Sequence, residues 1–155
     1  MNRQHPSRDD DARAFLRQVL TGAETPGSVG VLGFTDQLLL LTALLTHLLA
    51  RRFPELPGEA AATGWCRRAA DRVMLDGKPA DPALLLALLH LRDDPDAATS
   101  WRPTTATTHM LYLAGRIYAD LDPAEHPLHV VVETALIDAR PHLSTPPDHR
   151  RENPR

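Results

Sequence analysis

The stretch that decides the fold is residues 38–50, LLLLTALLTHLLA. At the α-helical rotation of about 100° per residue, its leucines cover about half the circumference, and Thr42, Ala43, Thr46 and Ala50 form a strip of small residues opposite. The run is shorter than the roughly 20 apolar residues that a membrane span needs. We therefore expect a central buried helix that contacts neighbours on several sides, or a second subunit.

The segments on either side of this stretch have the same spacing of apolar residues, three and four positions apart, and proline and aspartate separate them. None shows the sustained alternation of a half-buried strand. We predict an all-α fold, a compact bundle or orthogonal array of about six helices. The expected helices span residues 7–22, 35–52, 59–75, 82–93, 105–121 and 127–140.

Polar and glycine residues mark the ends of several of these helices. Asp81 followed by Pro82 has the composition of a cap and a first turn. Thr35 is expected to cap the helix of residues 35–52, with Asp36 in its first turn, where a carboxylate suits the helix dipole. Gly77 is expected to terminate the helix of residues 59–75.

With 155 residues, the chain is long enough to bury a core without a disulfide or a structural metal. We divide it into an N-terminal helix with a glycine-rich loop (1–34), a helical core domain (35–143) and a tail (144–155). The loop is expected to be a flexible connection, and its glycine spacing is not preceded by the strand that a dinucleotide-binding loop requires. The tail is expected to be disordered, because it contains no apolar residue.

Charge and composition exclude several classes of function. The formal net charge is −3, which provides no field to attract a polyanion and argues against general binding of nucleic acid or anionic membranes. The polar N-terminal residues lack the pattern of a secretory signal, so we predict a cytoplasmic protein. Lys78 is the only lysine against many arginines, a bias typical of a GC-rich bacterium.

Cys66 is the only cysteine, so it can form neither an internal disulfide nor a site with several thiolates. Its helical position groups it with Ala62, Ala69 and Val73, and we expect a buried, unreactive thiol. The sequence contains no phosphate-binding loop, zinc-protease motif or nucleophile elbow. This favours a protein that is not an enzyme and that has no cofactor.

Histidines provide the alternative hypothesis. His129 and Glu133 lie four residues apart on one helix, and His47 and His90 fall in leucine-rich segments. Helical-bundle metalloproteins take their ligands from such facing positions. The alternative is therefore a bundle enzyme that binds a metal or a small molecule in a pocket containing these four residues. The favoured interpretation is that His47 and His90 lie at the edges of their leucine arcs, with one ring nitrogen in contact with water, and that His129 and Glu133 form a surface pair.

Two helices carry stripes of aromatic and basic side chains, the residue types that dominate the binding energy of protein interfaces. These residues are Trp65, Arg68, Arg72, His109, Tyr112 and Arg116. The competing interpretation for Trp65 is a half-buried ring covered by arginine stems. We predict a small helical interaction or regulatory module that binds a partner protein through these residues or associates as a homodimer.

Overall fold

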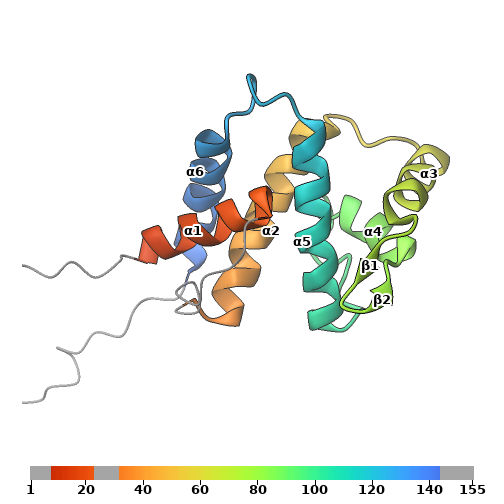
Figure 1. Ribbon diagram of the computed structural model, residues 1–155, viewed down its shortest axis with the longest axis horizontal. Coiled ribbons are helices and arrows are strands. Elements are labelled where there is room, and N and C mark those ends of the chain that lie inside the picture. Colours follow the sequence, from red (N-terminus) through yellow and green to blue (C-terminus); the bar gives the residue numbers. More distant parts are fainter. Residues whose placement is uncertain (1–7, 23–31, 144–155) are drawn as a thin grey trace, which may run out of the picture.

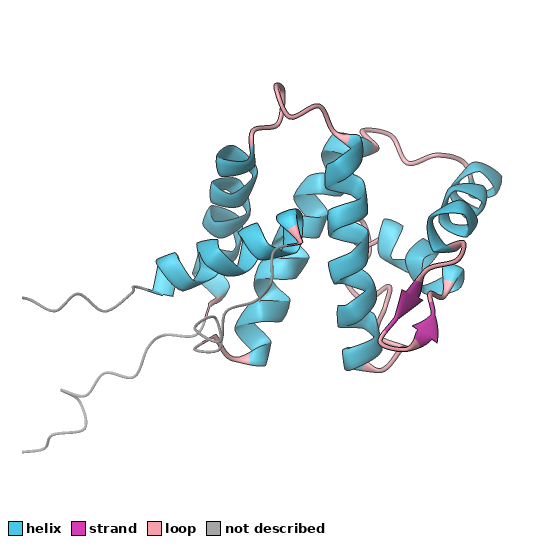
Figure 2. Cartoon of the chain, viewed as in Figure 1, coloured by secondary structure: helices cyan, strands magenta, loops and turns pink. Residues whose placement is uncertain are grey.

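The computed structural model describes residues 8–22 and 32–143, and within these ranges the chain folds as six α-helices with one short hairpin (Figures 1 and 2). The predicted all-α class is confirmed. The expectations for the glycine-rich loop and for the tail concern residues 23–31 and 144–155, outside the described ranges. The elements are α1 (Arg8–Thr21), α2 (Phe34–Arg52), α3 (Glu59–Ala70), β1 (Met74–Leu75), β2 (Lys78–Pro79), α4 (Pro82–Leu89), α5 (Pro103–Asp120), α6 (Leu128–Ala139) and the 3-10 turn η2 (Arg140–His142).

Helix α2 is central, as its leucine pattern predicts. It packs most extensively against α6 and α5, and α1 crosses in front of it (Figure 1). Its fully buried side chains are Leu40, Leu41, Leu44, Leu45, Leu48 and Leu49. Burial of each leucine stabilises the fold by about 1.5–3 kcal/mol. Because neighbours within the chain cover this leucine face, the face itself gives no reason for a subunit contact.

Helix α1 belongs to the same hydrophobic core. It contacts α6, α5 and α2, and its Ala12 and Leu16 are completely buried. These side chains join the same cluster as the leucines of α2. The N-terminal helix therefore packs across the boundary that we placed at residue 35.

The prediction that the third helix extends to Leu75 and stops at Gly77 is wrong, because α3 ends at Ala70. A hairpin follows, in which Leu75 pairs with Lys78 across a two-residue turn. The turn residues Asp76 and Gly77 have φ angles of 54° and 79°. Two positive φ angles are characteristic of the type I′ turn, for which Asp-Gly is a preferred dipeptide. Local turn chemistry thus overrides the helical periodicity.

The helix caps agree with the sequence in part. The Asp81 carboxylate accepts a hydrogen bond of 2.9 Å from the Ala83 amide and caps α4, as predicted. Thr35 is not the cap of α2, because this helix begins one residue earlier and Gly33 occupies the cap position. Asp36 does lie in the first turn.

Helix α5 separates the two halves of the molecule, with α1, α2 and α6 on one side and α3, α4 and the hairpin on the other (Figure 1). In the second half, α3 packs against α4 through its small side chains Ala62, Cys66 and Ala69. Among residues 8–22 and 32–143, no helix combines the length and the apolar character needed to cross a bilayer.

Candidate functional site

The two predicted stripes meet between α3 and α5. The guanidinium carbon of Arg116 lies 5.7 Å from the centroid of the Trp65 ring. Phe53, at the end of α2, meets the same indole edge to face, with ring centroids 5.5 Å apart and an interplanar angle of 88°. Trp65 is therefore half-buried and held on two sides, which agrees with the interpretation of a ring covered by arginine.

Two exposed arginines, Arg67 and Arg68, follow Trp65 on α3. Arg68 is one turn from Trp65, and its Nη1 lies only 3.4 Å from the position of a Cβ at Gly64, so this glycine leaves room for the guanidinium. Arg67 occupies the outer side of the same turn. We call Trp65, Arg67, Arg68 and Arg116 the Trp65 surface.

The arginine side chains at the end of α3 have no internal partners. Within the described ranges, those of Arg67, Arg68 and Arg72 form neither an ion pair nor a hydrogen bond. Arg116, in contrast, pairs with Asp120 at 2.6 Å, and Arg52 reaches the same carboxylate at 3.3 Å. Of the arginines of the Trp65 surface, Arg116 thus has a carboxylate partner, whereas Arg67 and Arg68 have none in the part of the chain that the structure describes.

His109 and Tyr112, two of the predicted partner-binding residues, form hydrogen bonds within the fold. The Tyr112 hydroxyl donates to the carbonyl of Ala69 on α3. His109 is only 4% exposed, and its Nε2 accepts from the Asp81 amide at 3.0 Å while Nδ1 lies 2.9 Å from the Thr105 carbonyl. The structure covers this side of α5 with α3 and the hairpin, which periodicity within a single helix cannot reveal. Partner binding by the six residues stays a prediction, and His109 is the least accessible of them.

The structure does not bring the four candidate metal ligands together. His47 lies half-buried on α2, whereas His90 at the end of α4 and His129 on α6 are exposed. Glu133 pairs with Arg13 of α1, and this bond lowers the pKa of the carboxyl. Across residues 8–22 and 32–143, no three His, Cys, Asp or Glu side chains are grouped to hold a metal ion. The alternative hypothesis therefore has no geometric support in this part of the chain.

Cys66 is buried as predicted. Its side chain is 1% exposed, and burial raises the pKa of the thiol to about 11. Because the thiolate is the reactive form, this thiol is chemically inert in the folded protein.

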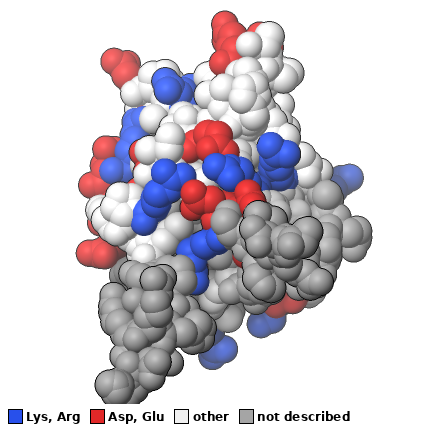
Figure 3. Space-filling model, turned by 90° about the vertical axis from the view of Figure 1, so that its left-hand side faces the viewer, with Lys and Arg blue, Asp and Glu red and all other residues white. Residues whose placement is uncertain are grey.

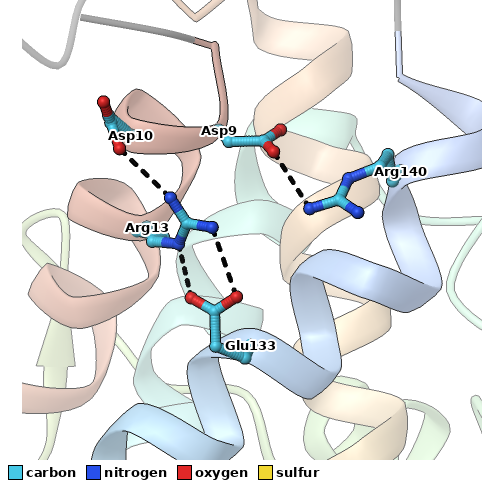
Figure 4. Close-up of polar contacts among 5 residues, drawn as sticks. All are labelled: Asp9, Asp10, Arg13, Glu133 and Arg140. Atoms are coloured by element: carbon cyan, nitrogen blue, oxygen red, sulfur yellow. Dashed lines mark hydrogen bonds and ion pairs between the residues drawn. The ribbon is translucent and has the colours of Figure 1, made fainter.

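The ion pairs between α1 and α6 were not predicted. Arg13 binds both oxygens of Glu133, and its Nη1 also lies 3.1 Å from Asp10. Arg140 pairs with Asp9 at 2.9 Å (Figure 4). Basic and acidic side chains accordingly interleave on this face of the molecule (Figure 3). Arg13 and Arg140 are therefore paired on this face, unlike Arg67 and Arg68, which have no partner in the described ranges.

Neither a protein family model, a curated protein nor a solved structure matches this chain. Function therefore has to be inferred from the side chains and their surroundings.

Proposed function

We propose that this protein is a helical interaction module that binds an acidic segment of a partner protein through the Trp65 surface. The observation that supports it most is that Arg68, which has no partner in the described ranges, lies one helical turn from the half-buried Trp65, with the equally unpaired Arg67 next to it in the chain. Tryptophan and arginine are the residue types most enriched among binding hot spots.

The contacts of Trp65 favour this role on physical grounds. Phe53 and Arg116 hold the indole, so little side-chain entropy is lost when a partner covers its exposed part. The guanidiniums of Arg67 and Arg68 are planar donors that bind carboxylates with two parallel hydrogen bonds. A segment with glutamate or aspartate beside an apolar side chain matches both features.

Nucleic acid fits this surface less well. Binding to a phosphate backbone generally requires a broad excess of lysine and arginine, since each neutralised phosphate contributes separately to affinity. Here the exposed cations are few, Asp120 lies against Arg116, and the chain as a whole is acidic.

Site-specific photo-crosslinking in the cells that produce the protein tests the proposal. A photoreactive amino acid at position 68 should capture a partner, and the captured peptide should contain Asp or Glu. Arg67→Glu, introduced beside it, should abolish capture because it reverses a neighbouring charge. The matched control carries the photoreactive residue at the exposed Arg17 of α1 and should not capture this partner.

Three results would contradict the proposal. They are identical capture from positions 17 and 68, capture that survives Arg67→Glu, and captured peptides without acidic residues. A covalent dimer formed through position 68 would instead assign the surface to a second copy of the chain.

A further inference from the structure

An apolar hollow of about 330 Å³ opens beside the first half of α5, away from Trp65. Four segments wall it: Leu38 and Thr42 come from α2, Leu88 from α4, Trp101 from the connection between α4 and α5, and Met110 from α5. No element is expected from the sequence between the helices at residues 82–93 and 105–121, so the hollow is not predicted. The signal was Trp101 itself, a large aromatic residue in an otherwise polar stretch.

The lining of the hollow determines the charge of what it binds. Every lining residue is a leucine, proline, alanine, threonine, methionine or tryptophan, so no side chain in the wall carries a charge. A charged ligand group would lose its hydration here without gaining a counter-ion, which is costly. The volume and the mainly apolar wall are those of a small-molecule site.

Thr42 offers a polar contact point. The helical threonines Thr107 and Thr108 donate their hydroxyls to the carbonyl four residues earlier, at 2.7 and 2.9 Å. The Thr42 hydroxyl forms no such bond with any residue in the described ranges. Thr42 lines this hollow and also a smaller one beside Asp138, and its hydroxyl has no partner in the described ranges that would compete with a ligand.

We propose that this hollow binds an uncharged, mainly apolar small molecule that places one hydrogen-bonding group beside Thr42. A flat ring system suits the site, because the Trp101 indole forms part of the wall and aromatic rings pair favourably with one another. This site is separate from the Trp65 surface and does not depend on partner binding, so either proposal can fail alone.

Fluorescence titration with N-phenylnaphthylamine, an uncharged probe that brightens in apolar sites, tests the proposal. The protein has two tryptophans, so Trp65→Phe leaves Trp101 as the only one. We expect saturable probe emission together with quenching of Trp101. The sulfonated analogue, anilinonaphthalene sulfonate, should bind at least about tenfold more weakly, because its charge would be desolvated.

Neighbouring alanines provide a matched pair of variants. Ala98 lines the hollow, whereas the adjacent Ala97 does not, and both are partly exposed. Ala98→Phe should weaken probe binding about tenfold or more, and Ala97→Phe should leave it within about twofold. Thr42→Val, which removes the hydroxyl and keeps the shape, should weaken binding about fivefold.

The proposal is overturned if the probe shows no saturable binding, if its sulfonate binds equally well, or if Ala97→Phe and Ala98→Phe behave alike. Should Ala98→Phe fail to fold, Thr42→Val and the quenching of Trp101 still decide the outcome. An absence of saturable binding would leave a partner's apolar side chain as the better occupant.

Discussion

The α1–α6 face and the α3 face both carry arginine, but they use it differently. On the first, Arg13 and Arg140 bind carboxylates that join the two helices. On the second, within the described ranges, Arg67 and Arg68 extend from α3 without any such partner. Pairing, rather than the number of arginines, therefore separates a face whose guanidiniums join two segments of the fold from one whose guanidiniums stay exposed.

The α3 side is held by neutral contacts instead. Its small side chains, including Cys66, are buried against α4, and Tyr112 donates to the backbone of α3. His109 joins α5 to the start of α4 by hydrogen bonds. We therefore expect the arginines of α3 to contribute little to stability. Five predictions test this contrast.

The largest effect is expected at a further ion pair of α1, which joins Arg8 to the buried Asp36 of α2. The Asp36 side chain is 3% exposed and binds Arg8, so Asp36→Ala leaves that guanidinium without its carboxylate. The free energy of unfolding, measured by urea denaturation, should fall by about 3 kcal/mol. The control is Asp138→Ala on the exposed side of α6, which should change it by less than about 0.5 kcal/mol. Equal effects of the two substitutions would show that this pairing does not stabilise the fold.

The second test concerns the neutral packing of α3. Because burial raises the pKa of Cys66 from 9.0 to about 11, its thiolate fraction near neutral pH falls about a hundredfold. Reaction with a disulfide reagent should be slowed by at least that factor in the folded protein and should become fast in urea. A native thiol that reacts at the unfolded rate would mean that α3 does not stay packed on α4.

The third test removes the hydrogen bonds of His109. His109→Ala leaves the Asp81 amide without its acceptor, and the free energy of unfolding should fall by about 2 kcal/mol. His129→Ala, at an exposed position of α6, is the matched substitution and should have little effect. If both substitutions had little effect on the free energy of unfolding, the hydrogen bond between Asp81 and His109 would not be needed to hold the start of α4 against α5.

The fourth test is the pH dependence contributed by His47. Burial, followed by repulsion from Arg51, lowers its pKa below 6.5, so the folded state favours the neutral ring. This stabilisation is fully present above pH 6.5 and is lost as the pH falls through the folded-state pKa. Unfolding free energies between neutral and mildly acidic pH should therefore decline more steeply in the native protein than in His47→Gln. Parallel curves would contradict this, and His90→Gln serves as the exposed control.

The smallest effect is expected on the unpaired face. Arg67→Ala and Arg68→Ala should each change the free energy of unfolding by less than about 0.5 kcal/mol, because neither side chain has a partner in the described ranges. Arg13→Ala, which breaks the bond to Glu133, should lower the free energy of unfolding by more than either of these substitutions. If Arg67→Ala or Arg68→Ala lowered the free energy of unfolding as much as Arg13→Ala, the contrast between the two faces would fail.

Much of the fold could be predicted because helix periodicity is a local property. The leucines of α2 and the Asp81 cap of α4 follow from spacing and from cap chemistry. The end of α3 was also encoded locally, in Asp76 and Gly77, but their hairpin signal competes with a continuing apolar pattern.

The candidate site could be predicted only in part. Residue type identified Trp65 and Arg116 separately, and the fold brought them into contact. His109 shows the limit of this reasoning. Its helix has neighbours on two sides, and the apolar pattern of a single helix predicts only one of these buried faces. The pairing of Glu133 with Arg13 likewise joins positions far apart in the chain.

The most direct measurement is a titration of Trp65 emission with a poly-glutamate peptide, in a Trp101→Phe background that leaves Trp65 as the only tryptophan. We expect a saturable change that weakens with added salt, disappears in the double variant Arg67→Glu/Arg68→Glu and persists in Arg17→Glu on α1. Identical titrations of these two variants, or no saturable change in the native surface, would contradict the role assigned to the unpaired arginines of α3.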